Sequence, residues 1–273
     1  MNKTLLKKTS VLLTLATVAP MSLQALETPI KNNIYASELS KEEHIEKWNS
    51  YNKQSPLGQS YFSKVNDTTQ TPYQAVGSLF IKNKPMLATG FVVSQNKIIT
   101  NYHVAREAKN NPENVKFRPG LTKNSEGKVE LPFGEFEAET IDEAPFGAGI
   151  DIAIIKLKPN KDGKNIGEVV EPLKFGNAEA VGPHQVLRVV GYPNNTTQFS
   201  MYSQKIEVHS TKQGLKYFGY TEEGNSGSPI LDDENNLVGI HAGRGGFDDG
   251  TEILVGHRFE KSLLKELKQK INN

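Results

Sequence analysis

A serine lies between two glycines in the segment Gly224-Asn-Ser-Gly227, toward the C-terminal end of the chain. Glycine adopts backbone angles that a side chain forbids, so this spacing predicts a sharp turn that exposes the Ser226 hydroxyl. Such a turn would leave the backbone amides of Gly224 and Ser226 free to stabilise an oxyanion. A nucleophilic serine is one interpretation of the segment, and an ordinary turn between two strands is the other.

A base and an acid that could activate this serine lie upstream. His103 follows a strand-like run that begins at Gly90, and Asp151 opens the apolar run Ile152-Ala-Ile-Ile. A carboxylate next to such a run is expected to be buried, where it needs a hydrogen-bonding partner such as an imidazole N–H. The order histidine, aspartate, serine is that of the chymotrypsin type of catalytic triad. These contexts together favour the nucleophile over the plain turn.

Composition excludes several other kinds of chemistry. The chain has 273 residues, 36% of them hydrophobic, which suffices for one large domain or two small ones. Its formal net charge of +1 gives no preference for nucleic acid or an anionic membrane, so we expect neither as a partner. The absence of cysteine excludes a thiol nucleophile and disulfide bonds. Without an acidic calcium loop or a His/Cys cluster, we expect no metal and no cofactor.

Residues 1–36 are expected to form a secretory signal segment. Three lysines precede an apolar run from Val11 to Leu23, which is too short to span a bilayer comfortably. Cleavage could follow Ala25 or Ala36, and the pattern does not choose between them. The mature protein is therefore expected to be secreted.

Helices are expected at both ends of the mature chain. Residues 37–73 should be an N-terminal helical extension, because Ser40-Lys-Glu-Glu43 has capping-box spacing before a helical periodicity that includes Trp48. Leucines at 263, 264 and 267 share one face of a helix over residues 260–271, which is predicted to pack against the second half of the chain.

Short β-like runs separated by turn residues fill the remainder. About six runs lie in residues 74–160 with His103 and Asp151, and about six lie in residues 161–273 with Ser226. An all-β fold of two six-stranded antiparallel β-barrels is therefore expected, joined by a connector and holding the active site in the cleft between them.

Several segments have counterparts in one known family. They are Glu-Lys-Trp-Asn at 46–49, Phe117-Arg-Pro119, Pro145-Phe-Gly-Ala-Gly-Ile-Asp151, Gly214-Leu-Lys-Tyr-Phe-Gly-Tyr-Thr221, Gly224-Asn-Ser-Gly227 and Leu237-Val-Gly-Ile-His241. On these segments, nearly all of the exported chain resembles the staphylococcal glutamyl endopeptidases, which include the V8 protease, and within them the exfoliative toxins. The first and third segments are similar to the toxins rather than to the V8 protease.

The resemblance implies a serine endopeptidase of chymotrypsin-like fold. In it His103 is the general base, Asp151 orients the imidazole and Ser226 is the nucleophile, with the amides of Gly224 and Ser226 as the oxyanion hole. In the toxins the peptide before this glycine can be flipped, which closes the hole until substrate binds. Whether Glu223, which precedes Gly224 here, favours the open or the flipped state stays open.

The resemblance also places Thr221 and His241 in the pocket for P1, the residue before the cleaved bond, where the family selects an acidic side chain, usually glutamate. A hydroxyl and an imidazole can together hydrogen-bond both oxygens of a carboxylate. Lys216 matches a basic position in the toxins and either adds positive potential at the pocket or is an exposed lysine. The histidines at 44, 184, 209 and 257 receive no functional role.

The leading hypothesis is a secreted, monomeric serine endopeptidase that cuts a host adhesion protein of the desmoglein type after glutamate. A broad V8-like glutamyl endopeptidase is the first alternative, since Pro229 follows the serine turn as in the V8 protease. A quality-control protease is the second, on the segment Ile-Thr-Asn-Tyr-His-Val, although no peptide-binding domain follows. A catalytically silent binding module is the third, and a complete triad disfavours it.

Overall fold

The computed structural model describes residues 62–82, 86–194, 199–246 and 252–272. The predicted signal segment and the predicted N-terminal helix lie outside these described residues. Within the described ranges, no helix is long and apolar enough to cross a membrane.

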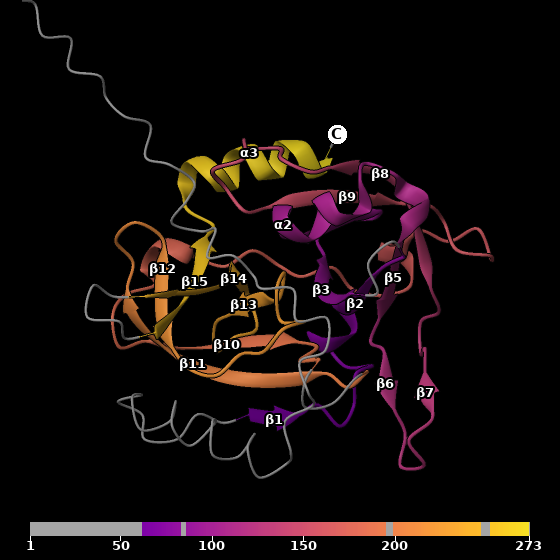
Figure 1. Ribbon diagram of the computed structural model, residues 1–273, viewed down its shortest axis with the longest axis horizontal. Coiled ribbons are helices and arrows are strands. Elements are labelled where there is room, and N and C mark those ends of the chain that lie inside the picture. Colours follow the sequence, from indigo (N-terminus) through magenta and orange to yellow (C-terminus); the bar gives the residue numbers. More distant parts are fainter. Residues whose placement is uncertain (1–61, 83–85, 195–198, 247–251, 273) are drawn as a thin grey trace, which may run out of the picture. The chain divides into compact units, whose positions relative to one another are not determined.

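Six antiparallel strands close the first barrel in the order β2-β3-β4-β9-β8-β5 (Figure 1). The strands are β2 (Val76–Ile81), β3 (Met86–Val92), β4 (Lys97–Thr100), β5 (Val115–Pro119), β8 (Phe136–Asp142) and β9 (Ala153–Leu157). Burial alternates along β5, as expected for a strand with one face toward a core. Its Phe117 ring packs within 2.4 Å of where a Cβ on Gly77 would lie, so β2 needs a glycine there.

The second barrel is formed by the next six strands along the chain. They are β10 (Val186–Gly191), β11 (Tyr202–Ser210), β12 (Leu215–Phe218), β13 (Pro229–Leu231), β14 (Leu237–Gly246) and β15 (Glu252–Arg258). Pairing between β11 and β12 closes the sheet, and the short strand β1 (Phe62–Lys64) adds to its edge on β11. The predicted all-β fold with two six-stranded barrels is confirmed.

Side chains from both barrels form one hydrophobic core cluster. Phe91 and Phe117 come from the first barrel, and Tyr192 and Tyr217 come from the second half of the chain. The buried Tyr192 hydroxyl donates to the carbonyl of Leu121 at 3.0 Å, so polar contacts also join the two halves. Packing between the barrels therefore fixes the position of any site that draws residues from both.

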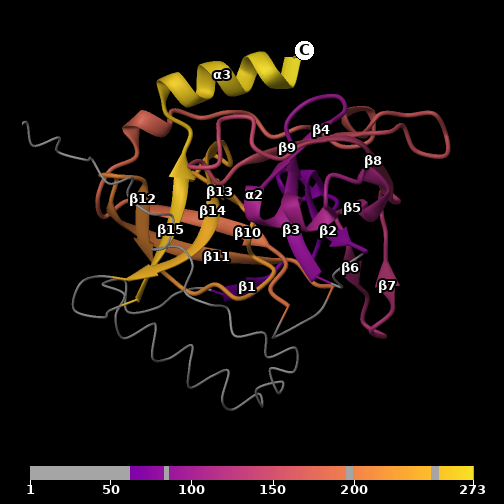
Figure 2. The ribbon, with the colours of Figure 1, turned by 45° about the horizontal axis from the view of Figure 1, so that its top comes forward.

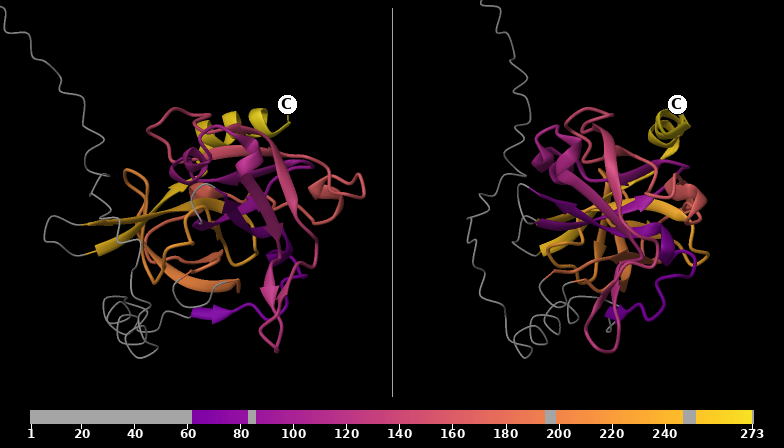
Figure 3. Two further views of the ribbon diagram at one scale, coloured as in Figure 1. Left: turned by 45° about the vertical axis from the view of Figure 1, so that its right-hand side comes forward. Right: turned by 90° about the vertical axis from the view of Figure 1, so that its right-hand side faces the viewer.

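Several short elements were not expected from the sequence. Strands β6 (Thr122–Lys123) and β7 (Val129–Glu130) form a hairpin that projects from the first barrel (Figure 3). His103 follows β4, as expected, and lies in the short helix α2 (Tyr102–Ala105). Single 3-10 turns complete the connections: η2 (Tyr73–Ala75), η3 (Arg106–Ala108), η4 (Pro112–Asn114), η5 (Ile166–Glu168) and η6 (Ala178–Ala180).

The C-terminal helix α3 (Lys261–Asn272) is confirmed, but its predicted packing is corrected in part. It begins at the end of β15 and runs toward the first barrel (Figures 1 and 2). There Lys97 Nζ donates to the carbonyl of Lys270 at 2.8 Å, and Lys270 pairs with Asp142 at 3.7 Å. A cation is favourable at the negative end of the helix dipole, which explains why this end rests on the first barrel.

Candidate active site

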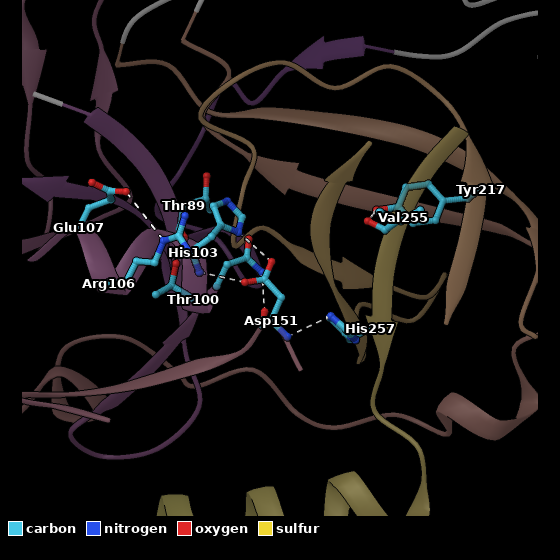
Figure 4. Close-up of polar contacts among 10 residues, drawn as sticks. Thr89, Thr100, His103, Arg106, Glu107, Asp151, Tyr217, Val255 and His257 are labelled. Atoms are coloured by element: carbon cyan, nitrogen blue, oxygen red, sulfur yellow. Dashed lines mark hydrogen bonds and ion pairs between the residues drawn. The ribbon is translucent and has the colours of Figure 1, made fainter. Parts of the chain in front are cut away.

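Asp151 and His103 form a hydrogen-bonded pair in the first barrel (Figure 4). His103 Nδ1 lies 2.7 Å from Asp151 Oδ2, and the His103 backbone amide donates to Asp151 Oδ1 at 2.9 Å. Burial would raise the pKa of Asp151, but the hydrogen bonds and charge of His103 outweigh it, so the pKa lies below its ordinary value. The carboxylate stays ionised and fixes the proton on Nδ1, which leaves Nε2 as a base. The His103 side chain keeps 36% of its surface exposed, so a reactant can reach it.

Ser226 lies, partly exposed, in a turn between β12 and β13 that is built around a buried asparagine. Asn225 Oδ1 accepts from the Glu222 amide at 3.0 Å, and the Asn225 carbonyl accepts from the Ser228 amide at 2.9 Å. Gly224 and Gly227 have φ angles of 92° and 83°, in the left-handed region that favours glycine. The predicted sharp turn is present.

The peptide between Glu223 and Gly224 is held in one orientation. Its carbonyl accepts from the Asn194 amide at 2.8 Å, and in a trans peptide the N–H points opposite to the carbonyl. A flipped peptide would turn this carbonyl toward the Ser226 amide instead. Within the described ranges, neither the Gly224 amide nor the Ser226 amide has an acceptor. The two amides are therefore free to donate, which corresponds to the open alternative.

Thr89 of β3 connects this turn to the first barrel. Its amide donates to the Ser226 carbonyl at 2.9 Å, and its hydroxyl donates to the Gly224 carbonyl at 2.8 Å. The same hydroxyl accepts from the Tyr192 amide at 3.1 Å. A Cβ on Gly227 would lie 2.1 Å from the Thr89 carbonyl, so only glycine allows this approach. Sequence reasoning missed Thr89, for which a buried threonine in an apolar strand was the available signal.

Thr221 and His241 are both buried, and His241 lies next to the serine turn. The His241 amide donates to the Ser228 carbonyl at 2.9 Å, and the His241 carbonyl accepts from the Gly227 amide at 3.2 Å. His241 Nδ1 lies 2.5 Å from the hydroxyl of the buried Tyr217. The structure therefore places His241 beside the serine turn, which Thr221 precedes in the chain.

Burial, followed by the charges of Arg244 and His103, lowers the pKa of His241 from 6.5 to about 3. The imidazole is therefore neutral at neutral pH. Burial favours the neutral form because water does not reach the ring to solvate a charge.

Arg244 is a basic residue of this region that the sequence analysis missed. Its Nη2 donates to the Thr221 carbonyl at 2.5 Å, and its charge acts on His241. Residues three apart on a regular strand face opposite sides, but the β14–β15 register shifts between His241 and Gly243. This irregularity brings Arg244 to the His241 side. β14 continues through the glycines at 243, 245 and 246, which are not typical strand residues and so gave no signal for Arg244.

Lys216 does not share this environment. It precedes Tyr217 in β12 and is partly exposed, whereas Tyr217 is buried against His241. Successive strand residues point to opposite faces, so the lysine faces away from the side on which Tyr217 contacts His241. The geometry favours the exposed-lysine alternative.

The described residues contain no group of three or more His, Cys, Asp or Glu side chains that could hold a metal ion. The described site offers a serine hydroxyl, a carboxylate-bound imidazole and two amides for chemistry.

Two barrels with a histidine–aspartate pair on one and a serine turn on the other define the class of chymotrypsin-like serine proteases. Residues 88–240 match the family model of the trypsin-like peptidase domain. The chain is 35% identical over 250 residues to exfoliative toxin A of Staphylococcus aureus, a match that covers 89% of each chain.

It is also 32% identical over 183 residues to a glutamyl endopeptidase of Staphylococcus epidermidis, covering 66% of this chain and 63% of that one. A solved Glu endopeptidase in complex with MPD shares the fold, with a TM-score of 0.63 at 21% identity over 79% of this chain and 99% of that one. The chain belongs to the staphylococcal family of chymotrypsin-like serine proteases that contains exfoliative toxin A and the glutamyl endopeptidases.

Thr89→Val should weaken both the fold and the reactivity of Ser226. Valine keeps the shape but leaves the Tyr192 amide without its acceptor and the Gly224 carbonyl without its donor. We expect the free energy of unfolding in urea to fall by about 1–3 kcal/mol, and labelling of Ser226 by an organophosphonate to slow. Thr140→Val, at an exposed position of β8, is the matched control. Wild-type stability and labelling in Thr89→Val would refute this role.

Stability should fall in mild acid because of His241. Its pKa is about 3 in the folded protein against an ordinary 6.5, so between these values the unfolded chain binds a proton that the folded chain does not. The free energy of unfolding therefore decreases as pH falls through this window. His241→Gln should show a shallower decline from pH 7 to about pH 5, above most carboxylate titration. Equal slopes for the two proteins would contradict the neutral histidine, and His209→Gln at an exposed site is the control.

Proposed function

We propose that the protein is a secreted serine endopeptidase that cleaves peptide bonds after glutamate. The observation that carries the glutamate preference is the placement of Thr221, His241 and Arg244 together beside the serine turn. A guanidinium supplies positive charge, while the hydroxyl and the imidazole supply hydrogen-bond donors. These are the groups that a carboxylate side chain requires in a buried pocket.

In the proposed reaction, Ser226 Oγ attacks the carbonyl carbon of the scissile peptide and His103 Nε2 takes its proton. Asp151 stabilises the imidazolium that forms, through the 2.7 Å contact to Nδ1. The free amides of Gly224 and Ser226 bind the negative oxygen of the tetrahedral intermediate. His103 then gives the proton to the leaving amine, and a water activated by the same imidazole hydrolyses the acyl-enzyme.

Because the pKa of His241 is low, Arg244 and His241 would bind the glutamate carboxylate in different ways. Charge on the protein side comes from Arg244, because His241 stays neutral. The Tyr217 hydroxyl has one proton and two neighbouring acceptors, His241 Nδ1 at 2.5 Å and the Val255 carbonyl at 3.3 Å. Donation along the shorter contact leaves the imidazole proton on Nε2. In this proposal Nε2–H donates to the glutamate carboxylate without the imidazole becoming charged.

Peptide libraries should show cleavage after Glu, weaker cleavage after Asp and much weaker cleavage after Gln. Arg244→Leu and His241→Leu should each lower kcat/KM for glutamyl peptides, because a buried carboxylate loses a partner. The loss of transition-state stabilisation calculated from kcat/KM should be roughly 2–5 kcal/mol. Lys216→Leu also removes one positive charge but lies on the other strand face, so it should retain wild-type selectivity. Ser226→Ala should be inactive. Cleavage by the wild type after Lys, Arg or Leu would refute the pocket assignment.

We further propose that a folded adhesion protein of skin, of the desmoglein type, is a substrate. The support is the match to exfoliative toxin A over 89% of each chain, whereas the match to the glutamyl endopeptidase covers 66% of this chain. A closed oxyanion hole would make generic unfolded substrates poor ones. Because the Gly224 and Ser226 amides are free, we expect unfolded glutamyl substrates to be cut as well.

Purified mature protein should therefore be incubated in parallel with casein and with a folded desmoglein ectodomain, with Ser226→Ala as the blank. We expect one glutamyl cut in the ectodomain and progressive hydrolysis of casein. An intact ectodomain together with degraded casein would reject the desmoglein proposal and leave a broad glutamyl endopeptidase.

A further inference from the structure

The acid of the triad makes a second contact to a histidine, from the other barrel. The backbone amide of Asp151 donates to His257 Nε2 at 3.2 Å, and Figure 4 shows Asp151 between His103 and His257. Asp151 precedes β9 of the first barrel, whereas His257 belongs to β15 of the second. The contact therefore crosses between the barrels at the catalytic acid.

All four polar groups of Asp151 have partners. Oδ1 and Oδ2 bind His103, and the carbonyl accepts from Asn101 Nδ2 at 2.9 Å. These partners lie on the first barrel, as does Asp151. Among the described residues, only His257 connects this aspartate by a hydrogen bond to the barrel that carries Ser226.

The chemistry of the contact fixes the state of the His257 ring. A backbone N–H can only donate, so Nε2 must accept with its lone pair, and the proton lies on Nδ1. A protonated ring would present a second donor to the amide and lose the bond. Burial lowers the pKa of His257 while the charge of Asp151 raises it, with burial the larger effect, so the ring remains neutral.

We propose that His257 is a positioning residue of the catalytic pair: its neutral Nε2 holds the Asp151 main chain against the second barrel and so sets the position of His103 relative to Ser226. This inference rests on the proposed triad. Thr89 makes the complementary link from the first barrel to the serine turn. In this proposal His257 acts through Asp151 and does not touch the substrate. Replacing it should therefore slow the chemical step and leave substrate binding unchanged.

The test compares His257→Leu, which removes the acceptor, with His257→Gln, whose amide oxygen can replace Nε2. We expect His257→Leu to lose about tenfold in kcat, the worth of one net hydrogen bond, with KM unchanged. Organophosphonate labelling of Ser226 should slow by the same factor. His257→Gln should retain activity within about twofold, since the hydrogen bond is restored. His209→Leu, the same exchange at an exposed histidine, is the matched control.

Labelling at the wild-type rate in His257→Leu, or an equal loss in His257→Gln, would overturn the proposal. Nitrogen NMR of the wild-type imidazoles, assigned by comparison with His257→Gln, gives a result that does not depend on the stability of the leucine variant. An unprotonated Nε2 on His257 at neutral pH supports the contact, and a protonated Nε2 overturns it. A wild type that resists labelling altogether would reject the triad, while the NMR result would still decide the tautomer.

Discussion

Hydrogen bonds between the barrels hold the serine turn against the first barrel, and the catalytic arrangement depends on them. The serine and its base come from separate closed sheets, so neither sheet alone can set the distance between them. The Thr89 amide and hydroxyl each donate to a carbonyl of the serine turn, and the hydroxyl also accepts from the Tyr192 amide in the second half of the chain. A Cβ at Gly191 would lie 2.0 Å from Ser228 Oγ and 2.9 Å from Thr89 Oγ1. Glycine at that position is therefore a requirement of the contact.

Burial and hydrogen-bonded partners determine which groups near the serine turn carry charge. A carboxylate with an imidazole partner remains ionised, as at Asp151, whereas burial keeps His241 neutral. Burial thus acts in opposite directions on two groups of one site, and hydrogen-bonded partners decide which one carries charge. Near His241 and Thr221 the permanent charge is that of Arg244, whose guanidinium does not deprotonate in proteins.

Local pattern predicted much of the fold, since the twelve barrel strands lie in residues 74–160 and 161–273, six in each, where about six β-like runs each were expected. Glycine spacing likewise predicted the turn at Ser226. Two residues near the site, Arg244 and His257, could not be predicted from the sequence, because their contacts depend on the three-dimensional arrangement of the strands. Arg244 joins His241 only because of an irregularity in β14, and His257 meets Asp151 only because two barrels pack together. Lys216 was assigned by resemblance, and strand alternation places it on the other face.

Each end of the described chain is attached to the barrel that it does not adjoin in sequence. β1 precedes the first barrel but pairs with β11 of the second, and α3 follows the second barrel but ends on Lys97 and Asp142 of the first. The halves are consequently interlocked by their own connections. A fragment cut between them would lose an edge strand from one half and a helix from the other. The two barrels therefore form one cooperative folding unit, and the geometry between histidine and serine requires both barrels to stay folded.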